Sequence, residues 1–262
     1  MDFVQVILVF LVTFIAAIDQ FSFLESLYQP IVMGPIIGAI MGDLQTGLIV
    51  GGTYQLMTIG NMPVGGAQPP NAVIGGIMAT VFAISLGIEP NAAVGLAVPF
   101  ALLGQYAVTI VFTISSPLMA KADQCAKDAN PAGINKINYM TMGMLGTLFG
   151  LITVAFFIAG DSVGKAMADN IPAWLMGGLG AAGGMMRYIG FATLLRVMIS
   201  KESWGFYFAG FALASLMAAA GLANQALILI AFIGFAVAYS DYQIQTRISS
   251  QTIVEGGDED GI

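Results

Sequence analysis

The sequence predicts an all-α, polytopic integral membrane protein with several transmembrane helices and, in its N-terminal third, broken or re-entrant segments. Of the 262 residues, 58% are apolar and only 9% are charged, whereas soluble domains carry about 25% charged residues. A soluble fold of this size would need a charged shell, and so few ionisable side chains cannot form one. The bilayer is therefore the expected solvent.

The N-terminal third predicts the broken segments. Its first apolar run, residues 3–18, is long enough to cross only a thin membrane. Two Gly-rich runs, 31–42 and 47–60, are separated by a polar break, and each is shorter than the roughly 20 residues that a spanning helix needs. Interrupted helices at membrane depth are tolerated only where protein buries them or where they line a cavity. Segment 61–71 holds three prolines and predicts an irregular, re-entrant loop.

The rest of the chain predicts regular helices around one main hydrophilic loop, residues 121–138. The apolar runs are 72–88, 92–120, 139–160, 171–195, 204–221 and 226–239. We therefore expect a membrane domain over residues 1–240. The polar segment 241–262 has too little apolar content to fold alone, and we expect a disordered tail there.

The basic residues predict the topology of the later spans. If the loop at 121–138 is cytoplasmic, only Lys165 of the eight basic residues lies clearly outside, in agreement with the positive-inside rule. The tail is then cytoplasmic as well. No basic residue precedes Lys121, so the orientation of the N-terminal third stays open.

Composition also excludes most chemistry. The chain has no histidine, which removes imidazole acid–base catalysis, His metal ligands and phosphohistidine. Cys125 is the only cysteine, so internal disulfides and thiolate metal clusters are excluded, and a plain loop thiol is favoured. A net charge of −7 with 8 basic residues argues against nucleic acid as a partner. We expect no catalytic residue, cofactor or metal, and no enzyme activity in this chain by itself.

Four glycines are spaced for close helix packing. Gly38 and Gly42 lie four residues apart, as do Gly47 and Gly51, which places small residues on one helix face and lets another helix approach. Packing alone explains such glycines. Asp43 has two interpretations: an interfacial helix cap, or a costly carboxylate at membrane depth that has a functional partner.

Amide side chains predict a site for a neutral, hydroxyl-rich ligand. Gln55, Asn61, Gln68 and Asn71 carry both donors and acceptors, which match the hydroxyl groups of a sugar. An ion pathway would more often show charged residues. The alternative is an exposed connecting loop, in which Asn, Gly and Pro are ordinary turn residues.

Further polar residues lie around and beyond this set. Asp19 belongs to an acidic and amide cluster with aromatic neighbours, which suits either a sugar site or the membrane interface; its other polar members are Gln20, Glu25 and Gln29. Gln105 is a candidate for an interhelical hydrogen bond. Arg187 is expected to snorkel, or to pair with a carboxylate such as Asp161 or Asp43.

The stretch from Gly38 to Gln55 resembles the signature of the membrane IIC subunit of the mannose/fructose/sorbose class of phosphoenolpyruvate-dependent sugar phosphotransferase systems. Its matching positions are Gly38, Gly42, Asp43, Gly47, Leu48, Ile49, Gly51, Gly52, Thr53 and Gln55. Tyr54 stands where a smaller residue is expected, and Gln55 where mannose-type members often have Glu. The stretch from Gly65 to Asn71 is closer to N-acetylgalactosamine-type members.

The resemblance implies a permease subunit that imports a hexose or hexosamine, with N-acetylgalactosamine favoured. Its implied partners are a membrane IID subunit, cytoplasmic IIA and IIB (or fused IIAB) subunits that carry phosphate on histidines, and membrane lipid. The resemblance also implies a multi-pass chain in the bacterial cytoplasmic (inner) membrane and a higher oligomer of IIC–IID pairs.

The expected substrate-binding residues are Asp19, Asp43, Gln55, Asn61, Gln68 and Asn71. The alternatives for function are a self-sufficient ion-coupled sugar transporter and a membrane scaffold or receptor without transport activity.

Overall fold

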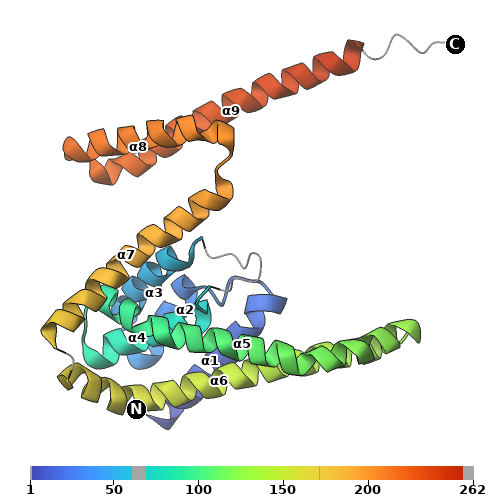
Figure 1. The fold of residues 1–262 in the computed structure, drawn as a ribbon, viewed down its shortest axis with the longest axis vertical. Coiled ribbons are helices and arrows are strands. Elements are labelled where there is room, and N and C mark those ends of the chain that lie inside the picture. The colour runs from blue at the N-terminus through green and yellow to red at the C-terminus, as the bar shows by residue number, and fades with distance from the viewer. Residues whose placement is uncertain (1, 61–68, 171, 256–262) are drawn as a thin grey trace. The chain divides into compact units, whose positions relative to one another are not determined.

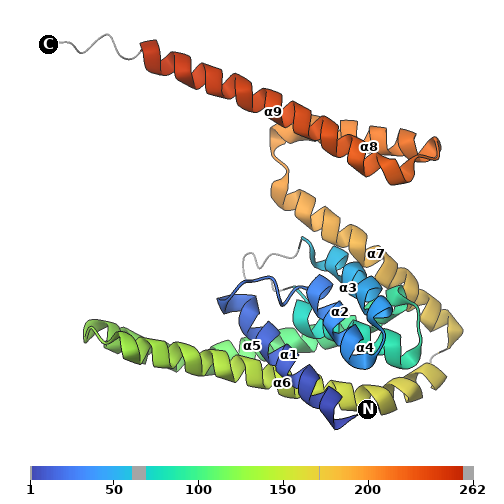
Figure 2. The same cartoon turned by 180° about the vertical axis from the view of Figure 1, so that it is seen from behind.

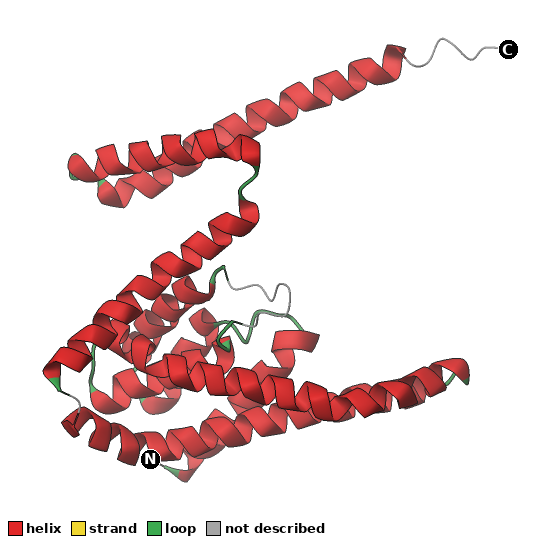
Figure 3. Ribbon diagram, viewed as in Figure 1, coloured by secondary structure: helices red, strands yellow, loops and turns green. Residues whose placement is uncertain are grey.

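The computed structural model describes residues 2–60, 69–170 and 172–255, and helices account for nearly all of these ranges (Figures 1 and 3). The helices of the first unit are α1 (Phe3–Ser22), α2 (Pro30–Met41), α3 (Leu44–Thr58), α4 (Ala72–Leu86), α5 (Pro90–Lys127), α6 (Pro131–Asn170) and α7 (Ala173–Met198). The second unit begins at residue 198 and holds a short 3-10 turn, η1 (Lys201–Ser203), followed by α8 (Trp204–Ala219) and α9 (Ala223–Glu255).

Helix α4 is the buried centre of the first unit. It is apolar on every side, and eleven of its fifteen residues are buried, as expected for a helix that is hydrophobic all round. It packs against α2, α3, α5 and α6. At 1.5 Å per residue it is about 22 Å long, which is less than the roughly 30 Å hydrocarbon core of a bilayer.

Helices α2 and α3 form a tight antiparallel hairpin whose backbones touch at glycines (Figure 2). A Cβ atom on Gly34 would lie 2.5 Å from the carbonyl oxygen of Gly47, and one on Gly47 would lie 2.8 Å from Cα of Gly38. The predicted pair of short, broken helices is confirmed. So is the packing interpretation of Gly38, Gly47 and Gly51, whereas Gly42 takes the left-handed turn between the helices, with φ of 86°.

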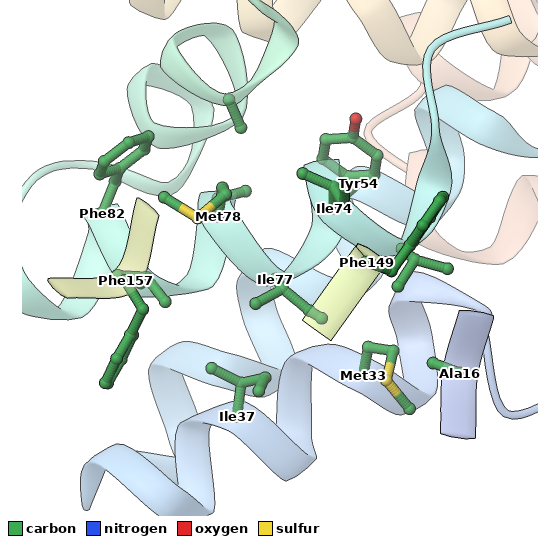
Figure 4. Close-up of a cluster of buried hydrophobic side chains, with 14 of the residues drawn as sticks. Ala16, Met33, Ile37, Tyr54, Ile74, Ile77, Met78, Phe82, Phe149 and Phe157 are labelled. Carbon is green, nitrogen blue, oxygen red and sulfur yellow. The ribbon is translucent and has the colours of Figure 1, made fainter. Parts of the chain in front are cut away.

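Large side chains from distant helices fill the core around α4. Figure 4 shows Ile74, Ile77 and Met78 of α4 beside Phe149 and Phe157 of α6. Because α6 also packs along α1, this core joins the first helix of the chain to the sixth.

The predicted hydrophilic loop at 121–138 is wrong, because α5 and α6 run through most of it. Only residues 128–130 separate the two helices, and Ala129 takes a left-handed conformation with φ of 49° at this turn. Ala, Lys and Gln are good helix formers, so a polar segment can remain helical. Polar residues therefore indicate where a helix leaves the membrane, not where the helix ends. Within the described ranges, four helices are long and apolar enough to span: Phe3–Ser22, Pro90–Lys127, Pro131–Ala159 and Ala223–Ile248.

The second unit is a helical hairpin of α8 and α9 with many exposed apolar side chains. Phe211, Phe232 and Phe235 are each at least 64% exposed, which suits a surface that faces lipid or another membrane chain rather than water. Helix α9 continues to Glu255. The expected disorder of 241–262 is therefore not found up to residue 255, because a helix started in an apolar segment propagates at one hydrogen bond per residue; residues 256–262 lie outside the described ranges.

Candidate functional site

A cavity of about 600 Å³ lies where α1 and α3 end and where α2 and α4 begin. Pockets for small molecules are typically of 300–1,000 Å³, and transporters often bind substrate at the ends of discontinuous helices. The residues that line the cavity are Gln20, Phe21, Glu25, Tyr28, Gln29, Gln55, Thr58, Ile59, Pro69, Pro70, Asn71, Ala72, Gln105, Val108 and Phe112.

Gln55 connects the end of α3 to the start of α2. Its Nε2 donates to Oε1 of Gln29 over 2.9 Å, and its Oε1 accepts from the backbone N–H of Ile31 over 3.3 Å. Because that N–H lies in the first turn of α2, where no intrahelical acceptor exists, Gln55 satisfies a donor that would otherwise lack a partner. The predicted site residue Gln55 therefore lines the cavity in a fixed orientation.

Asn71 connects α1, α4 and α5 at the cavity. Its Oδ1 accepts from the backbone N–H of Ile74 and caps α4, and its Nδ2 donates to Oε1 of Gln20 at the end of α1, both over 3.1 Å. Its backbone N–H donates to the carbonyl of Ala101 in α5. Asn71 is only 1% exposed, and the capping bond fixes the orientation of its side-chain amide. The residue nevertheless contributes to the lining of the cavity.

Asp19 holds the loop that follows α1. The side chain is fully buried, and its two carboxylate oxygens accept from the backbone N–H groups of Leu24 and Tyr28 over 2.8 and 3.0 Å. Asp19 itself does not line the cavity, although Glu25 in the loop does. Glu25 has φ of 54°, a left-handed conformation that costs a non-glycine residue roughly 1–2 kcal/mol.

Asp43 lies at the other end of the α2–α3 hairpin and caps α3. The backbone N–H of Thr46 donates to Oδ1 over 2.9 Å, and the Thr46 hydroxyl donates to Oδ2 over 2.6 Å. These bonds hold the pKa of Asp43 below its ordinary value. The cap interpretation is confirmed, and Asp43 is not among the cavity residues. The predicted site residues Asn61 and Gln68 lie outside the described residues.

The structure adds residues to the site beyond the expected substrate-binding set. Gln20, Gln29 and Gln105 bring further amides to the cavity, and Phe21 and Phe112 form an aromatic wall with ring centroids 5.4 Å apart. Gln20 and Gln29 had been grouped with Asp19 rather than with Gln55. The sequence indicates Gln105 only as a candidate for an interhelical hydrogen bond, because its neighbours in the cavity come from distant parts of the chain.

Arg187 contacts the start of α5 through its guanidinium group. Its Nη2 donates to Oδ1 of Asn91 over 3.0 Å, and its Nε donates to the carbonyl of Gly184. Asn91 in turn donates to Glu89. Among the described side chains, Arg187 therefore pairs with an amide at the start of α5 rather than with Asp43. The side chain of Asp161, the other expected carboxylate, lies outside the described ones.

The helical bundle and its polar cavity at broken helix ends define a membrane transport subunit. Residues 3–240 match the family described as the sorbose-specific IIC component of the phosphotransferase system. The chain belongs to this family, and it is a IIC permease component rather than an enzyme by itself.

Named relatives share most of their length with this chain. N-acetylgalactosamine permease IIC component 1 of Escherichia coli (strain K12) is 36% identical over 238 residues, covering 91% of this chain and 88% of the relative. The mannose-specific EIIC component of the same strain is 30% identical, covering 80% of each chain. The sorbose-specific EIIC component of Klebsiella pneumoniae is 30% identical, covering 79% and 78%.

Two solved structures share the fold. One, described only as a membrane protein, superposes with a TM-score of 0.80 at 29% identity. The other is a cryo-EM structure of the mannose transporter ManYZ in complex with microcin E492, with a TM-score of 0.58 at 28% identity. Each covers 93% of this chain and is itself covered to 96%. The predicted IIC membership and the helical membrane fold are confirmed.

Proposed function

We propose that this IIC subunit imports a hexose or hexosamine, N-acetylgalactosamine foremost, and that the cavity at the four helix ends binds the sugar. The observation that carries the proposal is the cavity's lining of side-chain amides, because amides both donate to and accept from hydroxyl groups. The choice of sugar is supported by the 36% identity to a chain named as an N-acetylgalactosamine permease component.

In this proposal the sugar exchanges hydrogen bonds with amides that are already held in place. Gln55 and Asn71 have their orientation set by backbone contacts, so binding orders little further chain. Phe21 and Phe112 offer an apolar wall to the C–H face of the ring. Asp19 acts indirectly, by holding the loop that carries Tyr28, and Asp43 acts by setting the start of α3.

The sugar then reaches the cytoplasm by a rigid-body movement, as in other systems with sites at discontinuous helices. We propose a IID subunit as the membrane partner, with IIA and IIB (or IIAB) subunits carrying the phosphate, in the bacterial cytoplasmic membrane and in a higher assembly of IIC–IID pairs. The fold shared with the mannose transporter ManYZ supports a second membrane subunit. The absence of histidine from this chain fits a division in which phosphate is carried elsewhere.

The test is a titration of the purified IIC–IID pair with a panel of hexoses and hexosamines. Gln55→Ala removes the bridge between α3 and α2, and Asn71→Asp keeps the α4 cap while removing the donor to Gln20. We expect each to weaken sugar binding by about tenfold, the effect of one lost buried hydrogen bond. Gln45→Ala is the control, since Gln45 is an exposed amide on the same helix as Gln55. Unchanged binding in both site variants, at unchanged membrane levels, contradicts the site.

Transport into vesicles separates this function from an ion-coupled transporter. The phosphotransferase mechanism requires sugar phosphate to form only when IID, IIB and a phosphate donor are present. Accumulation of free sugar by this chain alone, driven by an ion gradient, would support the self-sufficient transporter.

A further inference from the structure

We propose that Glu25 gives the cavity a charge preference, so that it accepts neutral and cationic sugars and disfavours phosphorylated ones. This inference rests on the proposed function, because it takes the cavity as the sugar site. It concerns which chemical forms of the sugar bind there.

Glu25 is the one fully charged side chain among the described residues that line the cavity. Segment 61–68 carries no ionisable side chain, and the first Lys or Arg of the chain is Lys121. All described lining residues come from positions 20–112, so no basic side chain is among them. The nearby carboxylate of Asp19 adds negative charge rather than removing it.

The helix dipoles at the cavity do not reverse the negative electrostatic potential there. Helices α1 and α3 end there and present the negative ends of their dipoles, whereas α2 and α4 begin there and present the positive ends. Each end corresponds to roughly half an elementary charge, so the four contributions cancel to first order. In addition, the first-turn N–H groups of Ile31 and Ile74 are already bonded to side-chain oxygens. The full charge of Glu25 therefore determines the sign of the potential.

The backbone holds Glu25 at this position. The residue is in the left-handed region with φ of 54°, and the loop on both sides of it is bonded to Asp19 at Leu24 and Tyr28. A non-glycine residue persists in such a conformation only where its surroundings impose it. The carboxylate is thus presented at the cavity by a fixed loop rather than by a freely moving one.

Phosphorylation changes the charge of the ligand and not the shape of its ring. A phosphoryl group adds roughly −1.5 to −2 charges at pH 7, and like charges a few ångströms apart repel one another. The phosphorylated product is therefore bound more weakly than the incoming sugar. A free hexosamine, which carries an ammonium group, is favoured by the same carboxylate.

The test compares three ligands that share one ring: neutral N-acetylgalactosamine, cationic galactosamine and anionic N-acetylgalactosamine 6-phosphate. Each is titrated calorimetrically into the IIC–IID pair carrying wild-type IIC, Glu25→Gln or the control Asp123→Asn. Asp123 is an exposed carboxylate of α5 outside the cavity. For Glu25→Gln we expect the affinity for the anion, relative to that for the neutral sugar, to rise by about three- to tenfold, and the relative affinity for the cation to fall by a similar factor.

Because Glu25 is exposed, these factors should shrink when the salt concentration is raised from about 0.02 M to about 0.5 M. Equal wild-type and Glu25→Gln affinities for both charged ligands overturn the inference. An equal loss of affinity for all three ligands in Glu25→Gln also overturns it, because Glu25 would then act as a hydrogen-bonding contact rather than through its charge. If wild-type protein binds the neutral sugar and only the charge effect is missing, the proposed function stands. If wild-type protein binds no neutral sugar of the panel, both fail.

Discussion

Replacing Gly51 by alanine tests whether backbone contact between α2 and α3 holds the cavity together. A Cβ atom at Gly51 would lie 2.6 Å from the carbonyl oxygen of Pro30 and 3.1 Å from Cα of Gly34. Both are backbone atoms, so no side chain can rotate away. The helices must separate by roughly 1 Å to restore ordinary contact distances of about 3.5 Å.

Gly52→Ala is a matched control on the neighbouring residue of the same helix. A Cβ atom at Gly52 would meet nothing within 4 Å. Both substitutions gain the same helix propensity, about 1 kcal/mol, so their difference isolates the crowding. Overpacking costs typically 1–3 kcal/mol, and Gly51→Ala should be less stable than Gly52→Ala by that amount. At about 2–4 °C per kcal/mol for chains of this size, the two melting temperatures should differ by several degrees.

The assay is thermal unfolding of the IIC–IID pair in detergent, followed by sugar titration of the folded protein. Because Pro30 follows Gln29, whose side chain binds Gln55, the displaced helix should also weaken sugar binding in Gly51→Ala but not in Gly52→Ala. Equal melting temperatures and equal affinities for the two variants would refute the role of this crossing.

Two further predictions concern polar groups of α3. Tyr54→Phe should raise stability by about 1 kcal/mol, because the Tyr54 hydroxyl is buried with no hydrogen-bond partner among the described residues; a loss of stability or of sugar binding would reveal a partner of that hydroxyl. Asp43→Ala should lower the melting temperature by removing the α3 cap, whereas Asp43→Asn should retain part of it. Because the folded-state pKa of Asp43 is lowered, the wild-type advantage over Asp43→Asn is present above the ordinary carboxyl pKa. It is lost as pH falls through the lowered value. An advantage that persists unchanged in acid would count against the Thr46 bonds as its source.

The local sequence pattern predicted that helices form in the apolar runs, but it did not predict where those helices end. The runs at 31–42 and 47–60 became α2 and α3 nearly as predicted, because short apolar segments broken by polar residues are a local feature. The loop at 121–138 was wrong because polarity reports solvent rather than backbone conformation, and a helix satisfies its own hydrogen bonds in either solvent.

The packing of Tyr54 could not be predicted from the sequence. It departs from the family signature, and the structure places it fully buried against Gly75 of α4. A Cβ atom on Gly75 would collide with the Tyr54 hydroxyl oxygen. The two residues are 21 positions apart in sequence, so the large side chain and the glycine that admits it are matched only in the folded protein.

The sequence by itself determined the solvent, the helical class, the family and the absence of phosphate-carrying histidine, because composition and short motifs are properties of the chain alone. Only the tertiary structure decided which polar residues form the site. It placed Asp43 in a cap, Asp19 under a loop, and Gln55 and Asn71 in one cavity with Gln20, Gln29 and Gln105. The physical reason is that a cavity is formed where helix ends from distant parts of the chain meet, and no local pattern records that meeting.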